Sequence, residues 1–107
     1  MPGAGPGHSV RAMHAVVGIW SADESRRAEQ EQALRAAVVP ETAARPGFVS
    51  GYWMRDAQTG KMHTVAVFDT EPHARAFKDH IAQATQAAAR VGVTVDVLAM
   101  VEVSAHA

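Results

Sequence analysis

Cysteine is absent from the 107 residues of this chain. Its absence excludes disulfides, thiolate nucleophiles, iron–sulfur clusters and cysteine zinc sites, and it suits a reducing cytosol, so we expect a cytoplasmic protein. Long apolar runs are also missing, because no run approaches the ~18 residues that a membrane-spanning helix requires. The net charge is only −1 and the basic residues are scattered, which argues against nucleic-acid and membrane-surface partners.

Several motifs that carry chemistry are missing as well. The glycines near the N-terminus follow no predicted strand and precede no predicted helix, so they do not form a phosphate-binding loop. Neither a serine nucleophile motif nor a pair of acidic metal ligands occurs. His73 and His80 share one predicted helix but are seven residues apart, whereas helical metal chelation uses a spacing of three or four. We therefore expect no metal and no cofactor.

The length and the 48% hydrophobic content indicate a single domain. Residues 1–12 are dense in Gly and Pro and lack the apolar middle region of a signal peptide, so they are predicted to be a flexible arm. The domain itself is expected to span residues 13–104. Met13 lies at the start of the first predicted strand and is a candidate for the physiological start of translation.

Four segments have the β-branched and apolar composition of strands. The two in the middle are separated by a short polar loop that contains Gly60, so we expect a hairpin. In the first strand, Gly18 removes side-chain bulk from one face, which permits a bulge or leaves room for another group. The predicted strands span 13–20, 48–55, 62–68 and 93–103.

Two helices are predicted between these strands, which sets the element order βαββαβ. The first follows a capping box at Ser21 and is expected to stop before Pro40. The second begins near Thr70, with Pro72 in its first turn, and ends at Gly92. This order predicts an α+β domain whose helices cover only one face of the sheet.

The last predicted strand alternates with unusual regularity. Its valines and Ala99 form one face, which we expect to pack on the helices. Its other face carries Leu98 and Met100 among polar residues, and with the neighbouring strands it would leave an apolar patch on a lone chain. Exposed patches of that kind usually mark an interface. We therefore expect a homodimer.

The segment Pro46-Gly47-Phe48 and the segment 65–71, followed by Ala74 and Phe77, resemble the dimeric α/β-barrel superfamily. The most similar branch is that of the antibiotic-biosynthesis-monooxygenase-like (ABM-like) domains, and the resemblance covers about residues 13–103. It implies a ferredoxin-like protomer with a four-stranded antiparallel sheet. It also implies that two such sheets pair into a dimeric α/β barrel, with a pocket between sheet and helices in each protomer.

The superfamily includes cofactor-free monooxygenases that form quinones, haem-degrading enzymes and small-molecule isomerases. The haem-degrading branch uses an Asn on its first strand and a Trp on its second helix, but this chain contains no Asn, and its matching aromatic residue is Phe77. Haem degradation by that scheme is therefore disfavoured. The resemblance favours a small-molecule-binding protein, with cofactor-free oxidation of a planar apolar substrate as its activity.

Eight residues are candidates for the pocket, and no catalytic residue is assigned. The aromatic candidates would line a flat apolar cavity, with a Trp N–H or the Tyr O–H as a polar contact. The histidines are the side chains most easily tuned to act as a base near neutral pH. The alternative is a structural or solvated role for each, and a non-enzymatic ligand-binding or interaction module whose pocket is filled. The candidates are His14, Trp20, Tyr52, Trp53, His63, Phe68, Phe77 and His80.

Overall fold

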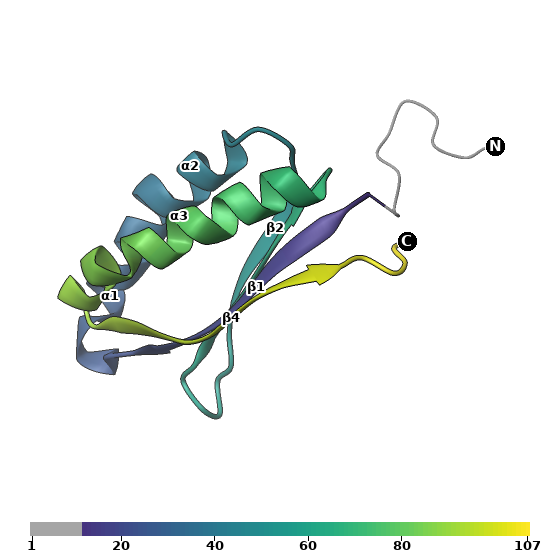
Figure 1. Ribbon diagram of the computed structural model, residues 1–107. Coiled ribbons are helices and arrows are strands. Elements are labelled where there is room, and N and C mark those ends of the chain that lie inside the picture. The colour runs from purple at the N-terminus through teal and green to yellow at the C-terminus, as the bar shows by residue number, and fades with distance from the viewer. Residues whose placement is uncertain (1–11) are drawn as a thin grey trace.

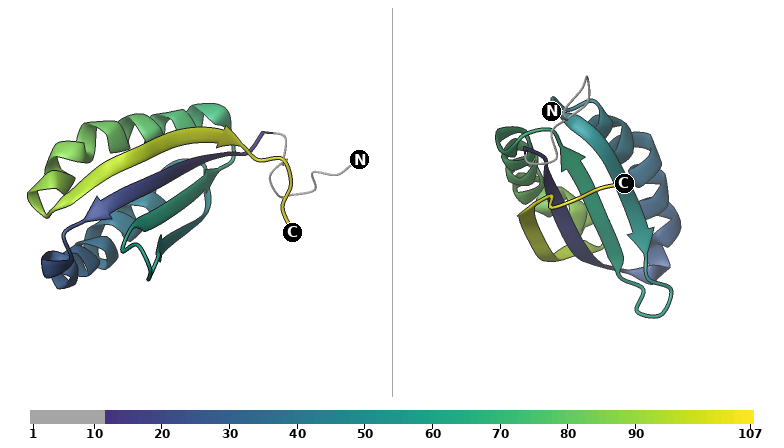
Figure 2. Two further views of the ribbon diagram at one scale, coloured as in Figure 1. Left: turned by 90° about the horizontal axis from the view of Figure 1, so that it is seen from below. Right: turned by 90° about the vertical axis from the view of Figure 1, so that its right-hand side faces the viewer.

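The computed structural model describes residues 12–107. They form a four-stranded antiparallel sheet in the order β2-β3-β1-β4, and all the helices lie on one face of it (Figure 1, Figure 2). This is the ferredoxin-like α+β fold that the sequence predicts. The predicted arm lies outside the described residues, apart from position 12. The elements are β1 (His14–Ala22), η1 (Glu24–Arg26), α1 (Arg27–Ala33), η2 (Leu34–Val38), α2 (Val39–Ala43), β2 (Phe48–Arg55), β3 (Met62–Phe68), α3 (Glu71–Arg90) and β4 (Val93–Glu102).

The first helical segment does not stop before Pro40, so that prediction is wrong. It continues as a π-helical turn, η2, into α2, in which Pro40 occupies the first turn. In an ordinary helix a proline loses one hydrogen bond and its ring collides with the carbonyl one turn earlier. The π turn widens the helix just before Pro40, with the Val39 N–H donating to the Leu34 carbonyl. The chain therefore passes through the proline and remains helical to Ala43.

The core lies between α3 and the sheet. On α3, Ala74, Phe77 and Ile81 follow one another at helical spacing and point toward the strands. The Phe77 ring packs on the Phe68 ring with their centroids 5.1 Å apart. Phe68 is fully buried. The buried cluster comprises Val16, Ala66, Phe68, Ala74 and Phe77.

A β-bulge in β4 changes which of its residues face the helices. Ile19 pairs with Val97, but the next residue, Trp20, pairs with Val95, so Asp96 is an extra residue in β4. Side chains alternate with a period of two, and one extra residue reverses the faces beyond it. The prediction that all the valines of β4 pack on the helices is therefore wrong beyond Val95. Leu98 and Met100 pack against the core instead.

The helices leave one side of the sheet uncovered (Figure 2), and we call this side the open face. The reversal in β4 leaves apolar side chains exposed on it. Four of its side chains are large, apolar and exposed: Tyr52 at 64%, Met54 at 47%, Val97 at 46% and Val101 at 42%. By strand register the open face comprises Ala15, Val17, Ile19, Ser50, Tyr52, Met54, His63, Val65, Val67, Val97, Ala99 and Val101. The apolar patch expected from the sequence is therefore present. On β4, however, its apolar side chains are those of Val97 and Val101, and not those of Leu98 and Met100 as predicted.

Two polar contacts hold the bulge in place. The Ser21 hydroxyl donates to Asp96 Oδ2 at 2.6 Å, and Lys61 Nζ donates to the same oxygen at 2.8 Å. The hydrogen bond from Lys61, and then that from Ser21, lower the pKa of Asp96 below its ordinary value of 3.8. The bulge is thus tied both to the end of β1 and to the β2–β3 hairpin.

The lowered pKa of Asp96 predicts a loss of stability in acid. A carboxyl group whose pKa is lowered by folding stabilises the fold above its ordinary pKa, and this stabilisation disappears as the pH falls through the folded-state value. We expect Asp96→Asn to unfold at lower urea concentration than the wild type near pH 7. It should also lose less of its stability on going to about pH 2.5. Asp79→Asn, an exposed position on α3, is the control. Equal acid sensitivity of Asp96→Asn and the wild type would contradict this account.

Candidate ligand-binding cavity

A cavity of about 440 Å³ lies between the helices and the face of the sheet that they cover. Small and apolar side chains from all four strands and from α3 form most of its wall. On α3 these are the residues that continue the core stripe toward the C-terminus of the helix. The lining contributed by α3 comprises Phe77, Ile81, Ala84, Ala87 and Ala88. Because four of these residues are smaller than Phe77, the space between α3 and the sheet widens beyond Phe77 and remains open.

Two indole rings, those of Trp20 on β1 and Trp53 on β2, line the cavity from the sheet side. Each lies over a glycine two residues earlier on its own strand, and therefore on the same face. A Cβ atom at Gly18 would stand 2.5 Å from Trp20 Nε1, and one at Gly51 would stand 3.0 Å from Trp53 Cη2. The missing side chains let both rings lie close against the strands. The motif Gly-x-Trp, which occurs in β1 and again in β2, is the sequence signal for this arrangement.

A polar contact joins the Trp20 ring to β3. Thr64 on β3 is the strand partner of both Gly18 and Trp53. Its Oγ1 accepts a hydrogen bond from Trp20 Nε1 at 3.1 Å, and Thr64 lines the cavity. Thr64 is not among the pocket residues predicted from the sequence. Thr64 lies four residues before Phe68 on β3, and residues four apart on a strand share a face. The alternation of side chains along β3 would therefore have placed Thr64 on the helix side.

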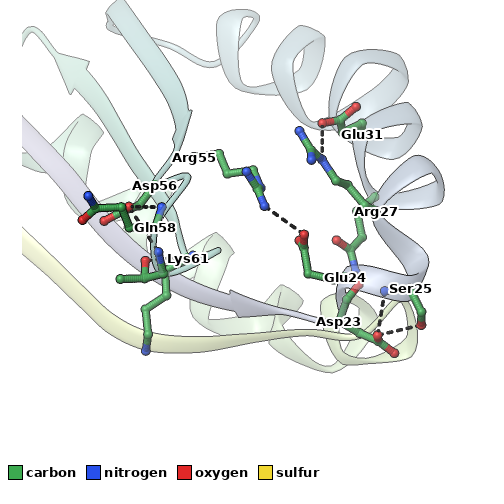
Figure 3. Close-up of polar contacts among 11 residues, drawn as sticks. Asp23, Glu24, Ser25, Arg27, Glu31, Arg55, Asp56, Gln58 and Lys61 are labelled. Carbon is green, nitrogen blue, oxygen red and sulfur yellow. Dashed lines mark hydrogen bonds and ion pairs between the residues drawn. The ribbon is translucent and has the colours of Figure 1, made fainter.

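Charged side chains line one end of the cavity, where β2 ends and the first helical segment begins (Figure 3). Arg55 donates to Glu24 at 2.8 Å, which bridges β2 to η1. Arg27 pairs with Glu31 at 3.1 Å along the helix. Beside them the buried Gln30 donates to the carbonyl oxygens of Asp23 and Val91, both at 2.9 Å. The cavity is thus apolar along its length and ionic at this end.

Three of the eight candidate residues line the cavity: Trp20, Trp53 and Phe77. Phe68 lies in the closed core between Phe48 and Phe77 rather than at the cavity wall. Tyr52 points to the open face because it alternates with Trp53 along β2. The expected pocket positions are therefore corrected: Phe68 lies in the core, and Tyr52 lies on the open face.

The histidine candidates lie away from the cavity. His63 is the strand partner of Ile19 and Met54 and so belongs to the open face. The ring of His14, at the far end of β1, approaches the Ala12 carbonyl at 2.9 Å, and His80 is exposed on α3. Their expected pocket positions are corrected accordingly. Among residues 12–107 no histidine lines the cavity, and Glu24 and Glu31 are the acidic groups that do.

Neither a metal cluster nor a membrane span occurs in the described part of the chain. Within residues 12–107, no three His, Asp or Glu side chains gather closely enough to hold a metal ion. None of the described helices combines the length and the apolar character that crossing a membrane requires.

Comparison with known proteins gives matches by structure only. No protein family and no curated protein matches the sequence. NE2512 of Nitrosomonas europaea, a protein of unknown function, superposes with a TM-score of 0.71 at 18% identity, over 92% of this chain and 96% of that one. SnoaB of Streptomyces nogalater, a cofactor-independent oxygenase, gives 0.62 at 16% identity, over 90% and 95%. The ActVA-Orf6 monooxygenase of Streptomyces coelicolor, solved with nanaomycin D, gives 0.63 at 16% identity, over 92% and 91%.

The chain has the fold of these monooxygenases. The ABM-like resemblance drawn from the Pro46-Gly47-Phe48 entry and the β3–α3 junction is confirmed at the level of fold. The match with each of these structures covers at least nine-tenths of this chain, so the monooxygenase fold accounts for nearly the whole domain.

Proposed function

We propose that this chain binds a planar, mostly apolar small molecule in the cavity. The observation that carries the proposal is the pair of indole rings, Trp20 and Trp53, laid against the sheet by Gly18 and Gly51 on one side of an open space. A flat apolar ligand would stack on such rings and remove their surface from water. The volume of about 440 Å³ leaves room for several fused rings. An open cavity favours this function over a module whose pocket is filled by its own side chains.

We further propose cofactor-independent oxygenation as the activity. In this reaction a substrate CH₂ between aromatic rings loses a proton, and its carbanion reacts with O₂. The products are a ketone and one water, so the substrate and O₂ supply every electron and atom. No described histidine lines the cavity, so the proton would go to Glu24 or Glu31, and Arg55 or Arg27 would stabilise the substrate oxyanion. Two neighbours in structure that are themselves oxygenases support this proposal.

Anthrone tests both parts of the proposal. Both tryptophans of the chain border the cavity, so binding of this planar tricyclic ketone should quench the intrinsic fluorescence and reach saturation. If the protein is an oxygenase, one O₂ should be consumed for each anthraquinone formed, faster than without protein. Arg55→Ala should slow this reaction by about 10²-fold or more if the guanidinium stabilises the oxyanion. Quenching without O₂ uptake would leave a ligand-binding protein, and the absence of saturable quenching would refute the binding itself.

We also propose that two copies of the chain pair through the open face. The support is the four large apolar side chains exposed there, on a side of the sheet that no described helix covers. A few such side chains burying several hundred Å² contribute many kcal/mol to association, at roughly 25 cal/mol per Å², before its entropic costs. The paired sheets would form the dimeric α/β barrel expected from the sequence, with one cavity in each protomer.

A further inference from the structure

Thr64 belongs to the cavity wall formed by the sheet. It lies on β3 between Gly18 of β1 and Trp53 of β2, and the indole ring of Trp20, which lies over Gly18, contacts its hydroxyl. A Cβ atom at Gly18 would come within 2.8 Å of Thr64 Oγ1, so the hydroxyl extends over the space that this glycine leaves. The hydroxyl is therefore a polar group of the cavity wall that lies beside the Trp20 ring.

The hydrogen-bonding capacity of this hydroxyl is only partly used. A threonine hydroxyl has one donor and two acceptor positions. Here the oxygen accepts from Trp20 Nε1 at 3.1 Å, while the structure records no acceptor for its hydrogen among residues 12–107. An indole N–H can only donate, so Trp20 fixes the hydroxyl as the acceptor in that contact. The O–H therefore remains available to a group inside the cavity.

We propose that Thr64 orients the ligand by donating this hydrogen bond to a carbonyl or phenolate oxygen of a planar molecule. The inference rests on the binding function proposed above and names the substrate class more closely, as an aromatic ketone or phenol rather than a hydrocarbon. Trp20 acts through Thr64 as a positioning residue, since its donation polarises the hydroxyl and strengthens the bond that the hydroxyl donates. A ligand without an oxygen would leave the O–H unpaired in an apolar space, which disfavours it.

Two probes of nearly equal shape test this assignment. Fluorenone and fluorene share one tricyclic skeleton and differ by the ketone oxygen. Titration of the Trp20 and Trp53 fluorescence should show that the wild type binds fluorenone more tightly. Thr64→Val removes the hydroxyl at nearly constant size. It should raise the Kd of fluorenone about two- to tenfold, which is the contribution of one neutral hydrogen bond, and leave the Kd of fluorene unchanged. Thr64→Ser keeps the hydroxyl and should keep the preference.

The other outcomes separate the two proposals. If the wild type binds both probes equally, or if Thr64→Val weakens both equally, the role of Thr64 is wrong while the binding function stands. If the wild type binds neither probe, the proposed function fails and the role of Thr64 fails with it. A thermal melt of each variant identifies misfolding, and Thr64→Ser then decides the question, because loss of the ketone preference in a folded Thr64→Ser protein would also overturn the inference.

Discussion

Phe77→Ala is expected to lower the free energy of unfolding by about 3–5 kcal/mol. The Phe77 ring is 6% exposed, packs on Phe68 at 5.1 Å between centroids and has the Arg45 guanidinium 5.8 Å from its own centroid. Alanine would remove these contacts and enlarge a cavity that is already open on one side, so the surrounding residues have little to close against. The total free energy of unfolding of a small domain is only about 5–15 kcal/mol, so the variant should be close to unfolding.

Urea denaturation measures the loss. Stability of a protein that self-associates depends on its concentration, so wild type and variant must be compared at the same protomer concentration. Arg75→Ala is the matched control, because it lies two residues earlier on α3 and its surface ion pair with Glu71 should contribute about 0–1 kcal/mol. If Phe77→Ala keeps nearly full stability but anthrone no longer quenches its tryptophan fluorescence, Phe77 is a ligand contact rather than a core residue.

The strands and their order along the chain were predictable because each strand carries its own signal. The hairpin follows from two β-rich runs around a short loop that contains Gly60, and the first turn of α3 from Thr70 and Pro72. The side of β4 that meets the helices was not predictable in this way. It depends on the bulge at Asp96, which is held by Ser21, 75 residues earlier, and by Lys61, 35 residues earlier. A pattern of alternating valines contains no sign of such distant contacts.

In the candidate site, too, the residues with a local sequence signal were predictable and those that depend on distant contacts were not. The tryptophans were predicted as pocket residues, and the paired Gly-x-Trp motif explains their position. The alternation of side chains along β3 would have excluded His63 from the pocket. Phe68 is buried on the helix side, and His63, five residues away, lies on the opposite face. The ionic end of the cavity was missed for a different reason. Arg55 and Glu24 lie 31 residues apart, and neither differs in its sequence surroundings from an ordinary surface charge.

The proposed dimer should dissociate when a charge is placed on the open face. Val101 is 42% exposed on β4, beyond the bulge, so its side chain lies on the open face rather than toward the helices. In a two-fold symmetric pair, Val101→Glu would introduce a buried carboxylate from each copy without a partner. We expect this to cost association about 3 kcal/mol or more, which raises the dimer Kd about 100-fold or more.

Analytical ultracentrifugation at micromolar concentration distinguishes the outcomes. The wild type should sediment as a dimer and Val101→Glu as a folded or partly destabilised monomer. Ala82→Glu, which adds the same charge at an exposed position of α3, should remain dimeric. Because each protomer holds its own cavity between sheet and helices, a folded Val101→Glu monomer should still bind fluorenone. A wild-type monomer, or a Val101→Glu dimer as tight as the wild type, would remove the open face as the interface, and the apolar side chains there would then require another partner.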